Sequence, residues 1–544
     1  MRPTRLLSSS TPCAVRWRHM SRHINTYVHA FLIILLISMS GCSSSFYDSD
    51  DPLAKIRYQT PQMVVWMTEF PKGGDLHNHA SGANYIEHGL LFAAQQGDYF
   101  DVQQMKIFAS NEQFHPNSAS KQVPCEGKIK DHDCVIRAHS LIYKSQYQPQ
   151  LLAYLDIVSM RGWHENTDDG QDHFFDTFAH SAIPDWDDQS IALILLRNHQ
   201  QHIRYVELMA STTPPEVMAT LKEKLPESAF DPNNFEANYQ KIAPYLEGAQ
   251  FKQAIDRFMA TREATIEQVL NTQGLTTIGP QPDIVVRYIS QMKRLDGPYD
   301  SFLQAAAYMK ASTLHPNIVA TNLVQNESGL PALANFETQM AIIDYFWQKY
   351  GAPNIALHAG ELVLRESPVE PMRDRISQTI IKGHAERIGH GVAIAWESNP
   401  AKTMAKMREH GIAVEICLSS NHSILGIKGK DHPLHLYLDA GVPVTLATDD
   451  EGVSRSNLTM EYIRAAQEQQ LSYNQLKMIA KNALAYSFLG GQGIYDADGN
   501  ILASFEPWVE QNQPPKISAS LSTKQYLQIR HEQDLRRFEA KYLN

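Results

Sequence analysis

The stretch VPVTLATDD, residues 442–450, is an apolar run that ends directly in two acids, Asp449 and Asp450. Short β-like runs recur along the chain, separated by amphipathic segments such as 332–350 and 400–410. Near-continuous apolar strands that alternate with helices are typical of a parallel sheet with both faces covered. The other runs are 74–79, 203–208, 284–289, 318–324, 355–358, 387–390 and 412–417. Eight strands predict an α/β fold of the (β/α)8 TIM-barrel type, whose reactive side chains lie at the carboxyl ends of the strands.

The domain boundaries follow from these runs. The barrel is expected over residues 61–500, with a long insertion at about 90–202 that covers the barrel mouth or contacts a partner. A Ser/Asp-containing tether, 43–60, precedes it, and a C-terminal extension, 501–544, is expected to end in a helix. The acidic stretch 496–500 matches a calcium loop only in part, so a hairpin turn is the preferred interpretation.

The composition is that of an ordinary globular protein. The 544 residues are 43% hydrophobic, and the formal net charge is −11. A phosphate-backbone binder needs clustered Lys and Arg, so no nucleic-acid partner is expected. A small neutral substrate fits this charge better, and the sequence indicates no particular oligomeric state.

The N-terminus has the layout of an export signal. Basic residues precede the apolar run 30–39, which is shorter than the roughly 20 residues that span a bilayer as a helix. The following Met-Ser-Gly-Cys, ending at Cys42, resembles a bacterial lipoprotein cleavage box with Cys42 as the lipidated residue. A signal peptide over 1–42 therefore predicts a periplasmic or outer-membrane lipoprotein of a Gram-negative-type bacterium, held by a lipid anchor. A plain signal peptide or an N-terminal anchor is the alternative, and Met20 is an alternative start.

Three further cysteines lie beyond this segment. Cys125 and Cys134 are nine residues apart in a polar stretch, and an oxidising compartment would let them form a disulfide, whereas two free thiols are the alternative. Cys417 lies in an apolar run and is expected to be a buried small hydrophobe rather than a nucleophile.

A His-x-His pair, His77 and His79, ends the first predicted strand. Side chains at i and i+2 of a strand lie on the same face, so both imidazoles can reach one ion. Such a pair also arises by chance in a chain with 23 histidines, so by itself it is weak evidence for a metal site.

Two other strand ends carry reactive residue types. In His358-Ala-Gly-Glu361, Gly360 lets the chain bend so that the Glu361 carboxyl returns over the barrel mouth. A carboxyl in a dry pocket has a raised pKa and can donate a proton near neutral pH. His390 lies between two glycines at the end of the sixth strand. Taken separately, an acid in the first turn of a helix and a hydrogen-bonded core histidine also explain these segments.

The adjacent acids Asp449 and Asp450 end the eighth strand. Two neighbouring carboxylates at a strand end repel each other and lose hydration, and a bound cation offsets both costs. The alternative is a turn in which both acids are solvated. All four strand ends would face one rim of the barrel. Three imidazoles and a carboxylate suit Zn²⁺ with one position open for water, so one zinc ion per chain is predicted. Zinc lowers the pKa of a bound water from ~15.7 to ~7.

Four segments resemble the signature motifs of the adenosine deaminase family of metal-dependent hydrolases. They are PKGGDLHNHASGANY (71–85), LHAGE (357–361), ERIGHG (386–391) and ATDD (447–450). The first segment is most similar to the secreted, growth-factor-like branch of that family. The resemblance runs in order from about residue 71 to 489, and it is specific in the motifs and loose between them. It implies hydrolytic deamination of adenosine, or of a close 6-aminopurine nucleoside, to inosine and ammonia.

The resemblance also implies a role for each site residue. Glu361 would protonate the purine ring nitrogen beside the reacting carbon. His390 would orient the attacking water, as a base or as an electrostatic partner. Asp450 would bind the imidazole-side nitrogen of the ring. The implied zinc ligands are His77, His79, His358 and Asp449.

Two positions depart from the family pattern and leave the substrate open. Gln325 stands where the family has a glycine whose backbone N–H meets the purine. Ser81 takes the place of an acid that faces the ribose in the cytosolic branch. Both are interpreted as substrate-binding positions. The alternatives are a deaminase of adenine or of a nucleotide, and an inactive barrel that acts in binding or signalling; the intact ligand motifs and Glu361 favour an enzyme.

Overall fold

A computed structural model describes residues 51–110, 135–496, 499–511 and 513–543. The predicted signal peptide with Cys42, and the predicted pair Cys125 and Cys134, lie outside these residues. None of the helices in the described ranges combines the length and the apolar character needed to cross a membrane. Cys417 is fully buried, as predicted.

All eight predicted barrel strands are present, and every pair of neighbours is parallel. They form two four-stranded sheets of order β1-β5-β6-β7 and β8-β9-β10-β11. The α/β fold of TIM-barrel type is therefore confirmed. The strands are β1 (Gly73–His79), β5 (Ile203–Ala210), β6 (Val285–Lys293), β7 (Ile318–Val324), β8 (Ala356–Ala359), β9 (Arg387–His390), β10 (Ala413–Ile416) and β11 (Val444–Leu446).

Two isolated parallel bridges join these sheets to each other. Thr321 pairs with Ile355 between β7 and the start of β8, and Asn78 pairs with Asp449 between β1 and the chain just after β11. At the second bridge, which we call the seam, the N–H of Asp449 donates to the His77 carbonyl at 2.8 Å. The N–H of His79 donates to the Asp449 carbonyl at 3.1 Å. The seam thus joins the first and last strands at residues predicted to bind metal.

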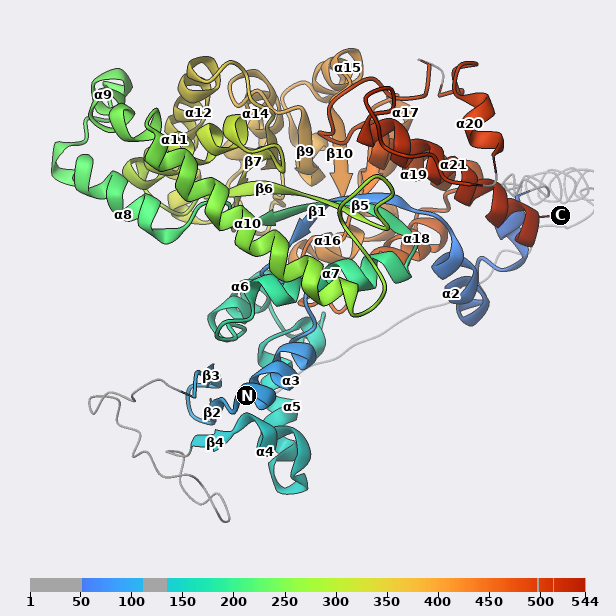
Figure 1. Cartoon of the computed structure of the whole chain (residues 1–544), viewed down its shortest axis with the longest axis horizontal. Coiled ribbons are helices and arrows are strands. Elements are labelled where there is room, and N and C mark those ends of the chain that lie inside the picture. Colours follow the sequence, from blue (N-terminus) through green and yellow to red (C-terminus); the bar gives the residue numbers. More distant parts are fainter. Residues whose placement is uncertain (1–50, 111–134, 497–498, 512, 544) are drawn as a thin grey trace, which may run out of the picture. The chain divides into compact units, whose positions relative to one another are not determined.

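Helices follow the strands and surround them (Figure 1). The helix predicted at 400–410 is α15 with those bounds, because Asn399 caps its first turn and Gly411, at a φ of 64°, ends it. The barrel helices are α8 (Pro215–Lys224), α9 (Phe235–Leu246), α10 (Ala249–Asn271), α11 (Pro298–Leu314), α12 (Leu330–Lys349), α13 (Val369–Met372), α14 (Arg375–Ile381), α15 (Pro400–His410), α16 (Leu418–Leu425), α17 (Leu434–Asp439), α18 (Leu458–Gln467) and α19 (Tyr473–Ala485).

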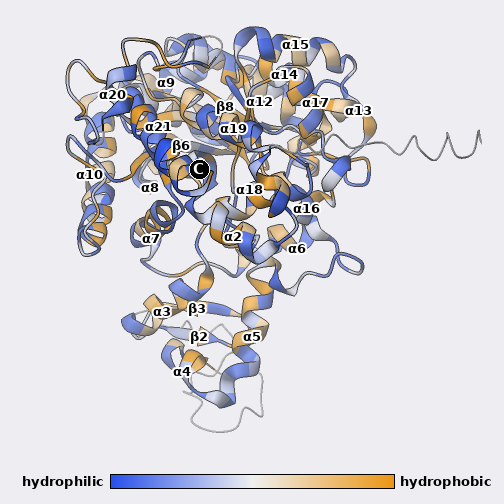
Figure 2. Ribbon diagram, turned by 90° about the vertical axis from the view of Figure 1, so that its right-hand side faces the viewer, coloured by the Kyte–Doolittle hydropathy of each residue, from blue (hydrophilic) through white to orange (hydrophobic). Residues whose placement is uncertain are grey.

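The insertion after β1 builds its own small layer. A three-stranded antiparallel sheet of order β3-β2-β4 packs with helices around a cluster that includes Phe100, Tyr154 and Trp186. Figure 2 shows α3, α4 and α5 grouped with β2 and β3. The strands are β2 (Tyr99–Asp101), β3 (Lys106–Phe108) and β4 (Val135–Arg137), and the helices are α3 (Ile86–Gln96), α4 (Ala138–Tyr143), α5 (Gln148–Ile157), α6 (Gly170–Asp176) and α7 (Asp187–Gln200).

The last residues of the predicted tether and the C-terminal extension both pack on the barrel, which the sequence did not predict. Arg57, in the predicted tether, is 3% exposed and donates to the Leu471 carbonyl at 2.8 Å, so the last residues of the tether belong to the folded domain. The C-terminal extension contains α20 (Glu506–Glu510) and the predicted terminal helix α21 (Thr523–Tyr542), which packs against Leu76 of β1. In α2 (Thr60–Glu69), Trp66 meets the Phe538 ring edge-on. The predicted hairpin near 496–500 is supported by an antiparallel bridge between Tyr495 and Ile501.

Candidate active site and metal centre

The side chains predicted as metal ligands meet at the seam. The Nε2 atom of His358, on β8, lies 3.1 Å from Nε2 of His77 and 3.2 Å from Nε2 of His79, both on β1. Oδ1 of Asp449 lies 3.5 Å from Nε2 of His77 and 3.3 Å from Nε2 of His79. The four ligand atoms all lie within 4.8 Å of one another, and each residue is at most 6% exposed.

Every one of these ligand-type side chains has a second hydrogen-bond partner behind it. Each imidazole directs its Nδ1 atom to an oxygen atom. The oxygen that faces His358 is Oδ1 of Asn322, which also accepts hydrogen bonds from two backbone N–H groups, so this atom is an acceptor. In its neutral, metal-binding form each ring therefore carries its proton on Nδ1 and turns the Nε2 lone pair inwards. The partners are Glu415 for His77 (2.7 Å), Gln291 for His79 (2.9 Å), Asn322 for His358 (2.8 Å) and Ser420 for Asp449 (2.6 Å).

This arrangement fits a cation. Three ring nitrogens and a carboxylate oxygen converge in a buried volume. Although burial opposes a charge on His77, its hydrogen bonds to Asp449 and Glu415 raise its pKa to about 10, so the cluster favours a positive charge. Burial and the neighbouring His77 and His390 lower the pKa of His358 well below its usual range, so this ring stays neutral, as a metal ligand must. Three imidazole nitrogens and one carboxylate oxygen form a donor set that zinc accepts.

Glu361 lies beside the cluster, just beyond β8. Gly360 takes a φ of 74°, the left-handed bend that the sequence predicted there. The N–H of Glu361 donates to Oε2 of Glu327 at 2.7 Å. Burial, then the charges of Asp449 and Glu327, raise the pKa of the Glu361 carboxyl well above its usual range. Its Oε1 has no hydrogen-bond partner among the described residues, so a protonated carboxyl is available to a ligand.

His390 ends β9 at a φ of 66° and is fully buried. Its Nε2 lies 3.6 Å from Oε1 of Glu361 and, within the described part of the chain, makes no hydrogen bond. Burial lowers the pKa of His390 to about 3, so the ring is neutral at working pH. The side chain therefore presents an unsatisfied ring nitrogen towards the same space as Glu361.

Asp450 faces this space from the seam. A Cβ at position 82 would lie 1.9 Å from Oδ1 of Asp450, so only glycine allows this approach. Burial, then the adjacent Asp449, raise the pKa of Asp450 well above its usual range. Its Oδ1 is also without a hydrogen-bond partner among the residues described. Glu361, His390 and Asp450 thus each offer one free polar atom.

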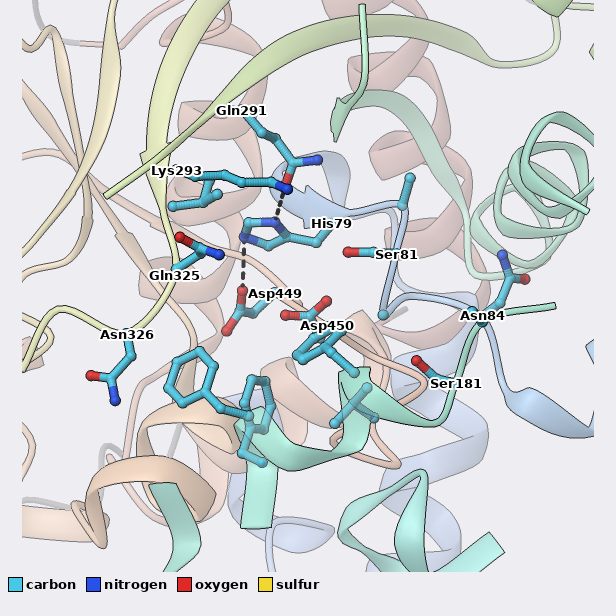
Figure 3. A pocket seen from close by; sticks show the side chains of 18 of the residues that line it. His79, Ser81, Asn84, Ser181, Gln291, Lys293, Gln325, Asn326, Asp449 and Asp450 are labelled. Atoms are coloured by element: carbon cyan, nitrogen blue, oxygen red, sulfur yellow. Dashed lines mark hydrogen bonds and ion pairs between the residues drawn. The ribbon is translucent and has the colours of Figure 1, made fainter. Parts of the chain in front are cut away.

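These side chains line a cavity of about 750 Å³, a size typical of small-molecule sites. In Figure 3, Gln325 and Lys293 lie on one side of His79 and Asp449, and Asn84 and Ser181 lie on the other. Ser81 also lines the cavity. The structure therefore brings all the predicted catalytic, substrate-binding and metal-ligating residues to one place.

Gln325 adopts a backbone conformation that favours glycine, with a φ of 82°. This agrees with the glycine that the related family carries at this position. Its Oε1 accepts from the backbone N–H of Leu295 at 3.2 Å. The side chain is thus directed to the backbone after β6, although the residue still lines the cavity.

The insertion supplies an aromatic wall of the same cavity. Phe174 and Phe175 of α6, Phe178, and Trp186 before α7 all line it. Phe174 also packs with Ile424 and Leu425 of α16, which ties the insertion to the barrel. The part of the insertion that the structure describes therefore helps to shape the site, in line with the interpretation as a cover.

The residues that hydrogen-bond to the predicted ligands and to Glu361 were not predicted from the sequence. Glu415, Asn322 and Gln291, which fix the three histidines, lie inside β10, β7 and β6, and Ser420 lies in α16. Glu327 lies in the loop after β7 and holds the backbone of Glu361. For Glu415 and Asn322, the polar side chain inside an apolar strand was the sequence feature that could have indicated a functional role.

The sequence is similar to proteins of known family. A family model for adenosine deaminase matches residues 242–494. An adenosine deaminase from Enterococcus faecalis is 31% identical over 173 residues, which cover 32% of this chain and 46% of that protein. An adenosine deaminase from Klebsiella pneumoniae subsp. pneumoniae is 35% identical over 176 residues, which cover 32% of this chain and 48% of that protein. The chain thus spans about half the length of these curated relatives.

Two solved structures are similar at low sequence identity. The N6-methyl-AMP deaminase from Arabidopsis thaliana gives a TM-score of 0.47 at 16% identity, covering 78% of this chain and 94% of that one. The adenine deaminase from Arthrobacter aurescens gives a TM-score of 0.42 at 16% identity, covering 77% of this chain and 94% of that one.

Proposed function

Because the chain carries an adenosine deaminase family domain over residues 242–494, we propose that it deaminates adenosine, or a close 6-aminopurine nucleoside, to inosine and ammonia. One observation carries the proposal. The buried cluster of three histidines and Asp449 adjoins three free polar atoms, on Glu361, His390 and Asp450, in a single cavity. A metal site next to a proton donor is the arrangement that hydrolysis of a ring C–N bond requires.

We propose zinc as the metal, one ion per chain, held by His77, His79, His358 and Asp449. A zinc ion there would supply the Lewis acidity that makes water nucleophilic near neutral pH. The partners behind the ligands support this choice, because they hold each imidazole in the tautomer that a metal needs.

The other side chains would bind and activate the ring. An adenine ring has nitrogen lone pairs on both sides of its amino-bearing carbon. Burial keeps Glu361 and Asp450 protonated, so each can donate to one of these nitrogens. Protonation of a ring nitrogen by Glu361 would make the carbon electrophilic, so that a water oxygen can add to it. One proton of that water would complete the ammonia that leaves as the C–N bond breaks, and the other would restore the Glu361 carboxyl. Tighter binding of the tetrahedral form than of the planar ring accelerates the reaction.

The rest of the cavity suits a neutral sugar. Ser81, Asn84, Ser181 and Ser190, which are all uncharged hydrogen-bonding residues, line the cavity together with Asp187. Hydroxyl and amide groups of this kind pair with ribose hydroxyls without a charge to desolvate. We therefore place adenosine ahead of the free base.

A nucleotide is the second candidate, because Lys293 lines the cavity at the end of β6. Among the residues that the structure describes, it is the one lysine or arginine in the lining. A 5′-phosphate that reached Lys293 would gain a charge-assisted hydrogen bond.

Ammonia release from adenosine, deoxyadenosine, adenine, AMP and guanine, with and without a chelator, tests both candidates. We expect the highest kcat/KM with adenosine and loss of turnover on chelation. A preference for AMP that Lys293→Met abolishes would establish the nucleotide instead. No ammonia from any of these substrates in the zinc-loaded protein would refute the proposed function.

We also propose that the protein acts outside the cytoplasm, anchored by a lipid on Cys42. The support is the layout of residues 1–42, in which an apolar run is followed by Met-Ser-Gly-Cys. Expression of wild type and Cys42→Ser, followed by fractionation, tests this. The wild type should sediment with membranes and the variant should not; a soluble wild type would refute the anchor.

A further inference from the structure

A chain of hydrogen bonds leads from a backbone amide to His390. The N–H of Leu434, at the start of α17, donates to Nδ1 of His432 at 3.2 Å. Nε2 of His432 lies 3.0 Å from Oδ1 of Asn421, on α16. Nδ2 of Asn421 lies 3.0 Å from Nδ1 of His390. The chain ends at Nε2 of His390, the free ring nitrogen that faces the cavity.

The polarity of this chain follows from its first link. A backbone N–H can only donate, so Nδ1 of His432 is an acceptor and the proton of the neutral ring lies on Nε2. That proton is donated to Oδ1 of Asn421, which leaves the NH₂ group of Asn421 facing His390. The NH₂ group donates to Nδ1 of His390, so the proton of neutral His390 lies on Nε2.

Burial stabilises these hydrogen-bond directions. His432 is 3% exposed, and Asn421 and His390 are fully buried, so solvent does not compete for their polar atoms. Burial lowers the pKa of His432 to about 3, and a neutral ring has one proton to donate. A flipped Asn421 amide would set two donors against each other at His432 and would lose a buried hydrogen bond.

We propose that Asn421 and His432 are positioning residues that hold neutral His390 with its proton on Nε2. The catalytic consequence rests on the proposed function. In this tautomer His390 donates a hydrogen bond into the cavity and does not accept a proton there. It therefore stabilises the negative charge that develops on the oxygen adding to the purine carbon. Of the two roles that the family resemblance leaves open for His390, the hydrogen-bond network selects the electrostatic one.

The tautomer can be measured directly, without turnover. The zinc-loaded protein is labelled with ¹⁵N in its imidazole rings, and the His390 signals are assigned by their loss in His390→Gln. We expect a protonated Nε2 and an unprotonated Nδ1. A protonated Nδ1 in the wild type would overturn the proposal, whatever the substrate proves to be.

Asn421→Asp reverses the direction of the hydrogen bond between residue 421 and Nδ1 of His390 while it keeps the shape of the side chain. A carboxylate accepts from both histidines, so Nδ1 of His390 should become protonated and kcat should fall at least about 100-fold. KM should stay within about threefold and zinc at one ion per chain. A kcat within threefold of wild type would refute the inference. The matched control is Asn238→Asp on α9, a buried amide bonded through both ends to Asp231, which should leave kcat unchanged.

His432 offers a rescue test. His432→Leu removes the donor that orients Asn421, so kcat should fall about tenfold or more. His432→Gln keeps an N–H donor at this position and should recover most of that loss. Equal losses in the two variants, with equal melting temperatures, would show that His432 only fills space. If the wild type released no ammonia at all, the proposed function would fail while the ¹⁵N result would still decide the tautomer.

Discussion

The buried carboxylate of Glu327 accepts a hydrogen bond of 2.7 Å from the backbone N–H of Glu361. Nη1 of Arg294 lies 3.3 Å from Oε1 of Glu327, and its Nη2 donates to the carbonyl of His358 at 2.8 Å. One ion pair therefore fixes the short segment that joins His358, a proposed metal ligand, to Glu361, the proposed proton donor. A buried charge is costly unless it is paired in this way, so the pair is expected to matter for function.

Removing this carboxylate should misplace Glu361. We expect Glu327→Ala to lower kcat at least about tenfold, because small shifts at a reacting group are expensive, while zinc stays bound. Steady-state kinetics and metal analysis measure both quantities. Glu397→Ala is the matched control, since Glu397 also accepts a backbone N–H, from Ile376 at 2.7 Å, outside the cavity. Equal effects of the two substitutions on kcat would contradict the role given to Glu327.

Glu361→Gln keeps the shape of the side chain but removes its acidic proton. Turnover should fall at least about 100-fold, because general acid catalysis contributes about 10²–10⁴-fold. Zinc content should stay at one ion per chain, since Glu361 is not among the proposed ligands. Full activity in this variant would remove Glu361 from the role of proton donor.

His358→Ala removes the imidazole that lies between the other two. We expect loss of stoichiometric zinc, measured by metal analysis after dialysis, because two imidazoles and one carboxylate hold the ion less tightly. The exposed His410 offers a control, and His410→Ala should keep its zinc. Unchanged stoichiometry in His358→Ala would refute this ligand assignment.

Metal removal should destabilise the fold as well as stop turnover. An ion that binds the folded protein and not the unfolded chain stabilises the folded state, and removing the ion withdraws that stabilisation. The zinc-free protein should melt at least about 3 °C below the zinc-loaded form in a thermal scan. The His358→Ala variant should show no such chelator effect. A chelator-independent melting temperature in the wild type would argue against a metal here.

His531, on α21, should make stability depend on pH. Burial lowers its pKa to about 4 from the ordinary 6.5. The unfolded chain therefore binds a proton that the folded protein excludes, so stability is fully present above about pH 6.5 and is lost as the pH falls towards 4. The loss is up to about 3 kcal/mol. Denaturant unfolding at several pH values should show a flatter profile for His531→Leu than for wild type; parallel profiles would contradict the assignment.

The barrel was predictable because its strands are buried on both faces. Several strands are then short apolar runs that local hydrophobicity marks, as for β7, whose predicted bounds agree with the structure. The predicted bounds of β9 also agree, although Ile388 is its one large apolar residue. The residues proposed as metal ligands were also predictable, since they lie at strand ends that share one rim. The three strands of the insertion are three residues each, too short to show an alternating pattern.

The supporting network could not be predicted in the same way. Glu415 and Asn322 stand out as polar residues in apolar strands, but the sequence does not say which ring each one holds. The link from Leu434 through His432 to Asn421 depends on how the loop before α17 folds back on α16. Such contacts are set by tertiary packing, so they appear only once the strands and helices are placed.

The seam has a consequence for biosynthesis. His77 and His79 leave the ribosome early and Asp449 leaves late, yet the backbone of Asp449 pairs with both histidines. A nascent chain thus holds only part of the proposed ligand set, so an ion bound by all four side chains would be captured only after the last strand docks beside the first. On the proposed function, pairing of the first and last strands would then also complete the active site.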